Sequence, residues 1–265
     1  MKVKFKNPPI NEVVIGAYFE PTLTAFRSEH IGLLWSRLRE DFPKVEQRPP
    51  IAGTNHGQET ALTSGDEFMV MPRYWFVSED EITLLQVQKD AFLLNWRHRD
   101  SEYPHYAESL KPSFDEYYRV FEKFLQKDVG VPFPTIGRCE LTYINMITPS
   151  DFWRGPQDTS DVIRSFSIPD WASADGAPLA FHCTYGIDID PNLQLHAALK
   201  TAEIADQPNS PCLILEIKAL GSYSGDAKQN IDGWYDGAHD AIVTRFLGMT
   251  QERIQRELWM REETQ

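Results

Sequence analysis

The chain has little of what marks secreted, metal-binding or membrane-spanning proteins. Its three cysteines, Cys139, Cys183 and Cys212, are widely spaced and form no C-x-x-C pair. Such a set favours buried thiols in a reducing compartment over a disulfide frame or a zinc site. The sequence has no run of about 18 apolar residues for a membrane span, and its basic start lacks the apolar stretch of a signal peptide. We therefore expect a cytoplasmic protein.

Basic residues are also scarce. Acidic residues outnumber them 39 to 26, and the formal net charge of the 265-residue chain is −13. Because a phosphate backbone is held mainly by clustered Lys and Arg, this balance argues against broad nucleic-acid binding, and it opposes docking on anionic membranes.

Signatures of common catalytic and cofactor sites are absent as well. The chain has no H-E-x-x-H, G-x-S-x-G, kinase or EF-hand pattern. The segment from Gly221 to Asp226 resembles a phosphate loop only in its glycines, and its spacing predicts a turn or a hinge. We expect no cofactor and no metal site.

Apolar residues, at 42% of the chain, are sufficient for a substantial core. In the first half their spacing predicts strands and helices over 13–19, 24–38, 73–77, 82–88, 91–97 and 113–125. Thr24 is the expected N-cap of the first helix, and Ser113 with Glu116 forms an expected capping box for the second. Residues 43–72 have no clear periodicity, which indicates a functional or mobile segment.

The second half repeats this order of strand, helix, three strands and helix. The expected ranges are 136–147, 161–166, 179–189, 193–204, 212–220 and 231–246, with a last helix from about Thr250. Residues 148–178 are expected to be irregular apart from the short helix. The closing helix should bury one stripe of residues, namely Ile231, Trp234, Tyr235, Ala238, Ile242 and Phe246.

The repeated order of elements is accompanied by a weak sequence echo. The helix opening Phe114 to Tyr118 is answered by Ile231 to Tyr235. This pattern predicts an α+β fold of tandem duplicated units, each a mostly antiparallel β-sheet packed with helices. The expected domains are 1–130 and 131–265, and one continuous globular domain is the alternative.

The segment from Asn7 to Ile15, N-P-P-I-N-E-V-V-I, resembles the start of a sporadically distributed prokaryotic family of similar length. Members of that family begin with an N-P-P-I-x-E-x-V-I strand. The C-terminal helices, with Ala238-His239 and then Arg245-Phe246, also resemble the family pattern. The family has no assigned biochemical function, so the resemblance implies no catalytic residues. The order of elements is similar to TATA-binding-protein-type and helix-grip folds, an analogy that does not transfer DNA binding.

Four residues are candidate catalytic groups. His182 and His196 lie on neighbouring predicted strands, where the two imidazoles could share a face. Cys183 would point to the opposite face, which leaves the pair without a third metal ligand. Asp236 and His239 are one helical turn apart, where a carboxylate can orient an imidazole, but no nucleophile stands at a defined spacing. Ordinary solvated side chains are the alternative for both pairs.

Five residues are candidate ligand-binding groups. Arg73 with Trp75, and Trp96 with Arg97 and Arg99, form the densest basic–aromatic pairings of this acidic chain. They fall on the outer strands of one small predicted sheet. Arginine beside aromatic rings suits an anion, a nucleotide or a single-stranded nucleic acid. Cross-strand packing, with arginine stems covering tryptophan, is the alternative.

Two classes of function remain. The leading hypothesis is a non-enzymatic binding or adaptor protein that recognises a partner protein or a small ligand, or forms a homo-oligomer, through a sheet face or long loops. By analogy with sporadically occurring prokaryotic proteins, it would serve an accessory system such as defence or toxin control. The second hypothesis is a hydrolase or transferase that uses the four His and Asp candidates in a cleft between the units.

Overall fold

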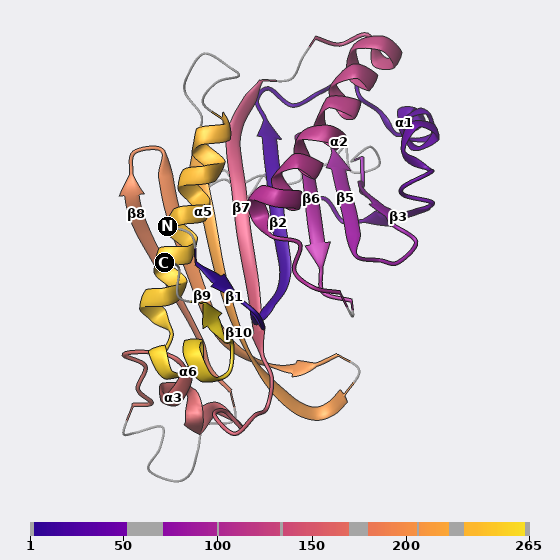
Figure 1. Cartoon of the computed structure of the whole chain (residues 1–265). Helices are drawn as coiled ribbons and strands as arrows, with labels where there is room; N and C mark the ends of the chain where they lie inside the picture. The colour runs from indigo at the N-terminus through magenta and orange to yellow at the C-terminus, as the bar shows by residue number, and fades with distance from the viewer. Residues whose placement is uncertain are drawn as a thin grey trace, which may run out of the picture. The chain divides into compact units, whose positions relative to one another are not determined.

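The computed structural model describes residues 3–51, 71–99, 101–132, 135–169, 180–205, 207–222 and 231–262. Nine strands form one large sheet in the order β3-β4-β5-β6-β2-β7-β10-β9-β8, and a separate pair joins β1 to β11 (Figure 1). The predicted α+β class with a mostly antiparallel sheet and packed helices is confirmed. The tandem duplication is a further step, and it is taken up as a proposal below.

The chain divides into two units, a central unit (Val14–Cys139) and a terminal unit (Met1–Val13 with Glu140–Gln265). Strands β2 and β7 contribute residues to both. The central unit contains most of β2 (Ile10–Phe19), then α1 (Ile31–Leu38), β3 (Lys44–Arg48), β4 (Arg73–Val77), β5 (Thr83–Gln88), β6 (Ala91–Arg97) and α2 (Lys111–Phe124). The terminal unit contains β1 (Lys4–Phe5), most of β7 (Ile136–Ile147), α3 (Thr159–Val162), β8 (His182–Asp190), β9 (Leu193–Ile204), β10 (Gln207–Ser222), α5 (Ile231–Met249), α6 (Glu252–Glu257) and β11 (Arg261–Glu262). The boundary predicted near residue 130 stays a prediction.

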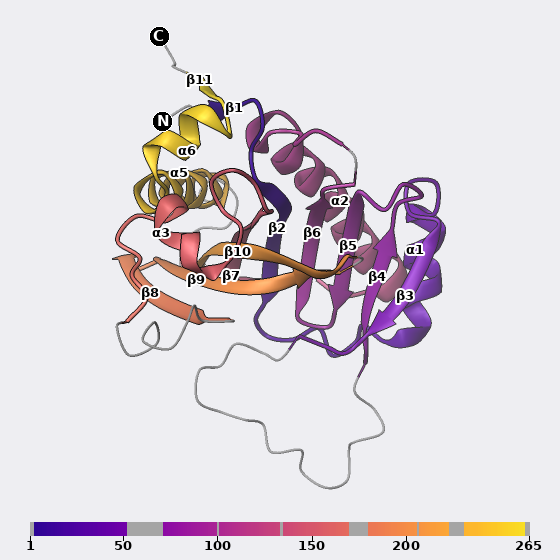
Figure 2. The ribbon, with the colours of Figure 1, turned by 90° about the horizontal axis from the view of Figure 1, so that it is seen from below.

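Helix α2 lies on one face of the central unit's sheet (Figures 1 and 2). Aromatic rings form the contact between them. Phe92 of β6 stacks on Phe121 of α2 with a centroid distance of 5.1 Å, and Phe19 of β2 stacks on the same ring at 6.0 Å. Each such pair contributes about 0.5–1.5 kcal/mol beyond the burial of its area. These aromatic residues therefore form the core-facing side of α2.

Both expected helix starts in the central unit are wrong. Helix α1 begins at Ile31 after a short 3-10 turn, so Thr24 lies outside it. Helix α2 begins at Lys111 and follows a π-helical turn at 106–110, so Ser113 is inside the first turn instead of capping it. Pro112 comes soon after this π-helical turn, and burial of Leu110 favours the earlier start.

The expected loop over 43–72 is wrong at its beginning. Lys44–Arg48 forms strand β3, which pairs antiparallel with β4 from Lys44 opposite Val77 to Arg48 opposite Arg73. Charged and polar residues dominate this strand, so it has no apolar alternation to detect, and pairing with β4 supplies its structure. Residues 52–70 lie outside the described part of the chain.

In the terminal unit, α5 covers the face of the sheet formed by β9 and β10 (Figures 1 and 2). The predicted stripe is confirmed for Tyr235, Ala238, Ile242 and Phe246, which are all buried. The short helix expected at 161–166 occurs slightly earlier, at Thr159–Val162. The expected first strand of the three begins at His182, and residues 170–179 lie outside the described part.

The two ends of the chain meet in the terminal unit. Lys4 pairs with Glu262 and Phe5 with Arg261 in the β1–β11 ribbon. The Phe5 ring packs edge-on against Phe246 of α5 at 5.9 Å. The N-terminal strand is therefore part of this unit's core, although it is distant in sequence.

We predict opposite effects on stability for two glycine-to-alanine substitutions in the central unit. A Cβ on Gly16 of β2 would lie 2.7 Å from a carbon of the buried Leu93 side chain, whereas a Cβ on Gly32 of α1 would meet nothing within 4 Å. Gly16→Ala should lower the free energy of unfolding by about 1–3 kcal/mol through overpacking, and Gly32→Ala should raise it by up to about 1 kcal/mol. Urea denaturation measures both, and equal effects of the two substitutions would contradict this packing.

Candidate functional site

Charged and aromatic side chains gather on the face of the central unit's sheet that does not pack against α2. Side chains alternate between the two faces of a strand. Because Phe92 and Leu94 of β6 are buried on the α2 side, Asn95 points to the far face, together with its cross-strand neighbours. We call the group on this far face the arginine–tryptophan cluster, and it comprises Arg48, Arg73, Trp75, Gln86 and Asn95.

Strand register brings the members of the cluster together. Arg48 of β3 is directly opposite Arg73 of β4, and Trp75 of β4 is opposite Gln86 of β5. The guanidinium carbons of Arg48 and Arg73 lie 4.6 and 5.5 Å from the centre of the Trp75 ring. Both distances are within the range of a cation–π contact.

The buried side-chain amide of Gln86 connects the members of the cluster by hydrogen bonds. The Oε1 of Gln86 accepts hydrogen bonds from Arg73 at 2.7 Å and from the indole nitrogen of Trp75 at 3.1 Å. Its Nε2 donates to Oδ1 of Asn95 at 2.7 Å. Gln86 and Asn95 are only 6% and 3% exposed, and buried amides of this kind need hydrogen-bond partners within the protein.

The cluster holds two neighbouring positive charges, and only one of them has a carboxylate partner among the described residues. Arg48 is exposed and forms an ion pair with Glu46. Arg73 is half-buried, and within the described part of the chain it has an amide partner and no carboxylate partner. Its Nε atom is buried without a hydrogen-bond partner. Desolvation lowers the pKa of Arg73 and the neighbouring Arg48 lowers it further, while Tyr18 acts in the opposite direction.

A third arginine lies on the same face. The Arg138 guanidinium stacks over the ring of Tyr18 of β2 at 4.5 Å. The even-numbered residues of β2 share the far face, as the contact of Val14 with Ala91 and Leu93 shows. This face therefore combines several guanidinium groups with aromatic rings, in a chain that is strongly acidic overall.

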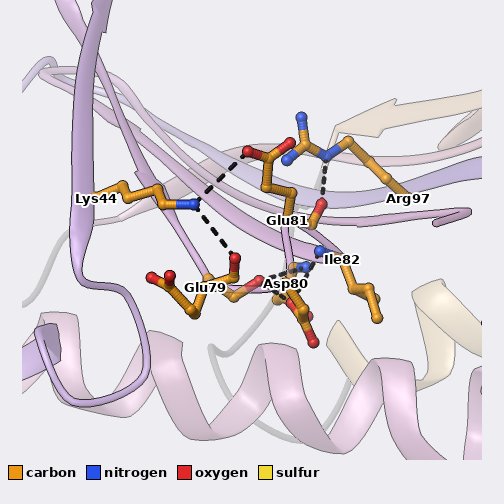
Figure 3. A network of polar contacts seen from close by, with 8 residues as sticks. Lys44, Glu79, Asp80, Glu81, Ile82 and Arg97 are labelled. Carbon is orange, nitrogen blue, oxygen red and sulfur yellow. Dashed lines mark hydrogen bonds and ion pairs between the residues drawn. The ribbon is translucent and has the colours of Figure 1, made fainter.

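The second basic–aromatic group does not join the first. Arg97 lies at the end of β6, where its Nε donates to the carbonyl of Glu81 at 3.0 Å (Figure 3). Lys44 contacts the same turn, with its Nζ 3.2 Å from the Glu79 carbonyl and 3.7 Å from the Glu81 carboxylate. Glu81 has a φ of 60°, a conformation that costs a non-glycine residue about 1–2 kcal/mol. Arg97 and Lys44 therefore brace the turn between β4 and β5.

Trp96 and Arg99 are separated from the cluster as well. Trp96 is buried on the α2 side of the sheet and packs edge-on against Tyr103 at 5.4 Å. Arg99 is exposed, and its Nη1 donates to the carbonyl of His98 at 2.9 Å. Of the five predicted ligand-binding residues, the cluster contains Arg73 and Trp75.

Sequence reasoning missed Arg48, Gln86 and Asn95. Arg48 falls in the segment 43–72, whose lack of apolar periodicity predicts no strand. The two glutamines of β5, Gln86 and Gln88, alternate with the apolar Leu85 and Val87. Glutamine at alternate positions of a buried strand indicates a polar pattern on one face, and that signal was present in the sequence.

The four predicted catalytic residues lie on two faces of the terminal unit's sheet. His182 pairs with Lys200, and His196 pairs with Gly186, so the two histidines share a face but are four residues apart along the strands. That separation is about 13 Å at the rise of a strand. The Nε2 of His196 is buried and has no hydrogen-bond partner in the described part of the chain.

The other two candidates belong to α5, which packs on the opposite face. The His239 ring is 6.0 Å from that of Tyr143, and its Nδ1 is 3.9 Å from Oδ1 of Asp240. Burial lowers the pKa of His239, although Asp240 and Asp236 act in the opposite direction. The sheet thus separates His239 and Asp236 from His182 and His196, and the four residues form no shared site.

Further findings bear on function. Among the described residues, no group of three or more His, Cys, Asp and Glu side chains is placed to hold a metal ion. None of the described helices has the length and apolar content that a membrane span requires. Of the segment expected as a hinge, Gly221 and Ser222 end β10, and residues 223–226 lie outside the described part. Comparisons with protein-family models, curated proteins and solved structures found no match to this chain.

We predict that Gln86→Leu lowers the free energy of unfolding by about 1–3 kcal/mol, because it leaves the side-chain groups of Arg73, Trp75 and Asn95 without their buried partner. Gln47→Leu on β3 is the matched control, since Gln47 is exposed. Urea denaturation of both variants is the measurement. A loss of stability no larger in Gln86→Leu than in Gln47→Leu would show that the amide does not organise the cluster.

We predict that acid destabilises this protein through His239. The unfolded imidazole has a pKa near 6.5 and the folded one is lower. Below about pH 6.5 the unfolded state therefore binds more protons, and stability falls as the pH falls. His239→Gln should flatten the dependence of unfolding free energy on pH between 6.5 and 5, measured by urea denaturation. His98→Gln, at an exposed histidine, should leave the wild-type slope, and a similar slope in His239→Gln would rule out this coupling.

Proposed function

We propose that this chain is a non-enzymatic binding protein and that the arginine–tryptophan cluster holds the anionic group of its ligand. The observation that carries the proposal is the pair of adjacent guanidinium groups over Trp75, of which Arg73 is half-buried and has no carboxylate partner in the described residues. Glu46 already pairs with Arg48, whereas Arg73 has an amide partner alone, so an anion bound beside Arg73 would offset the repulsion between the two guanidinium groups.

The chemistry of the cluster favours a phosphate or a carboxylate. A guanidinium presents its N–H groups as a planar fork that matches both groups, and charge-assisted bonds of this kind are about twice as strong as neutral ones. Gln86 fixes the positions of Arg73 and Trp75 by hydrogen bonds. A ligand would therefore meet side chains that are already ordered, which reduces the entropic cost of binding.

Either a small metabolite or an acidic segment of a partner protein carries such an anion. Direct titration by calorimetry with adenosine monophosphate, inorganic phosphate and a glutamate-rich peptide distinguishes these sources. Binding of the nucleotide or of phosphate supports a small-ligand role, and binding of the peptide alone supports an adaptor role. If none of the three binds at millimolar concentration, the proposal is wrong.

Substitution of Arg73 is the sharpest test of the site. Arg73→Ala removes a half-buried guanidinium that hydrogen-bonds a buried amide, and it should weaken binding of the anion roughly 10- to 100-fold, as expected for loss of about 1.5–3 kcal/mol. Arg73→Lys should restore little, because an ammonium group lacks the planar fork. Arg99→Ala removes the same charge from an exposed position outside the cluster. An equal loss in Arg99→Ala would mean that binding reflects general charge and not this site.

We infer that the two units descend from one duplicated set of strands and helices. We also infer that the chain is a member of the sporadically distributed prokaryotic family that its N-terminus resembles. The order of strands within each unit supports the first inference. In the central unit β2 is followed across the sheet by β6, β5 and β4, and in the terminal unit β7 is followed by β10, β9 and β8. The extra strand β3 has no equivalent in the described part of the terminal unit.

The biological setting follows from composition and analogy. We place the protein in the cytoplasm, where three scattered cysteines remain thiols. A binding role in an accessory system such as defence or toxin control fits its acidic composition and its sporadic family. The described positions of His182, His196, Asp236 and His239 give no support to the hydrolase or transferase alternative.

A further inference from the structure

Strand β8 is an outer strand of the sheet and presents apolar side chains to solvent. It ends the order of strands in the terminal unit, with β9 as its described neighbour. Tyr185 and Ile189 are 55% and 41% exposed. Tyr185 forms an apolar row along the strand with Cys183 and Ile187, on the face where β9 buries Leu195 and Leu199, and Ile189 follows at a register shift between Asp188 and Asp190. Exposed apolar edge strands are sites where another strand pairs.

The free hydrogen-bonding groups of β8 can be assigned from its pairing. The carbonyl of Phe181 accepts a hydrogen bond from the Thr201 amide of β9 at 3.1 Å. In an antiparallel pair, successive residues direct their N–H and C=O groups alternately to the neighbour and away from it. Odd-numbered residues therefore bond β9, and the outward row comprises His182, Thr184, Gly186 and Asp188.

The strand at the opposite edge of the sheet, β3, is protected by charge against pairing with another strand. Strand β3 carries Lys44, Glu46 and Arg48 within five residues. Charged residues of this kind prevent pairing of edge strands. Strand β8 has no lysine or arginine from His182 to Asp190, and its two carboxylates, Asp188 and Asp190, lie at its C-terminal end beside a register shift. The edge from His182 to Ile187 therefore lacks that protection.

We propose that β8 is the interface of a symmetric dimer, in which it pairs antiparallel with β8 of a second copy of this chain. The two-fold axis passes beside Tyr185, so each Tyr185 is opposite its equivalent. Such an interface uses the same patch on both subunits and must be complementary to itself. It shares no residue with the arginine–tryptophan cluster, so it holds independently of the proposed ligand.

Charge and shape are complementary in this register. His182 is placed opposite Asp188 of the second copy, and the pair occurs twice by symmetry. On the other face Cys183 is opposite Ile187, so the apolar row of one copy meets that of the other. The outward backbone groups of Thr184 face those of Gly186. Opposite charges and apolar residues directly across a ladder each stabilise the pairing by about 0.2–1 kcal/mol.

A cysteine cross-link tests both the interface and its register. Residues 185 of the two copies form a non-hydrogen-bonded pair, whose Cα atoms lie about 4.5 Å apart, within the range of about 4.4–6.8 Å for a disulfide. In a Cys183→Ser background, Tyr185→Cys should give a disulfide-linked dimer under mild oxidation, seen on a non-reducing gel. Ile189→Cys in the same background is the matched control, since it is exposed but lies eight positions from its equivalent in this register. Equal cross-linking of both variants, or none in Tyr185→Cys, would overturn the proposal.

A charge exchange at equilibrium provides the second measurement. The substitution His182→Asp places two carboxylates opposite each other at both ends of the interface. The dissociation constant of the dimer, measured by sedimentation equilibrium, should rise roughly tenfold. Adding Asp188→His to that variant restores opposite charges and should return the constant to near its wild-type value. A wild-type protein that stays monomeric at hundreds of micromolar, or a double variant no better than the single one, would refute this interface.

Discussion

The packing of α2 on one face of the central unit's sheet is the interaction on which the rest of that unit depends. Phe92 and Phe19 both stack on Phe121, with centroid distances of 5.1 and 6.0 Å, and burial of each such ring contributes about 1.5–3 kcal/mol. Because strand side chains alternate, fixing Phe92 on the helix side fixes Asn95 on the other. The core on the α2 side therefore determines which residues lie on the far face, where Val14, Ala91 and Leu93 form a smaller buried cluster of their own.

Polar groups on that far face have to satisfy one another. An unpaired buried amide costs about 1–3 kcal/mol, and Gln86 avoids this cost by bonding Arg73, Trp75 and Asn95 at once. The result is an ordered set of side chains in which the Arg73 guanidinium is held by Gln86, while its buried Nε has no hydrogen-bond partner in the described part of the chain. The hydrogen bonds that satisfy the buried polar groups therefore also fix the geometry of the cluster in which an anion would bind.

The same division of faces recurs in the terminal unit with a different outcome. There α5 covers the apolar face, and the other face carries Lys218, whose Nζ lies 3.5 Å from the buried carboxylate of Glu140. That ion pair matches each charge with a nearby opposite one, as burial requires. The apolar face, however, extends past its buried β9 residues to β8, where Tyr185 is exposed. Exposed apolar surface at the β8 edge therefore distinguishes the terminal unit from the central unit.

The sequence predicted the elements with strong periodicity and failed where periodicity is weak. The strands at 73–77 and 91–97 and the buried stripe of α5 follow from apolar spacing alone. Strand β3 has no such spacing, so its pairing with β4, and with it the role of Arg48, depended on tertiary contacts. Arg73 and Trp75 could be nominated from composition. Their link to Gln86 required strand register, which a single sequence does not specify.

Register and alternation also decide against the predicted catalytic residues. His196 faces away from α5, since its cross-strand neighbour Lys218 contacts Glu140 on the far side of the sheet. His239 packs against Tyr143 on the helix side. Two sheet faces are separated by the backbone itself, so no rotamer change brings these imidazoles within the 2.6–3.2 Å or so that proton transfer requires. A reaction that needs both His196 and His239 would therefore require a different fold of this unit. A binding function requires no such change of fold.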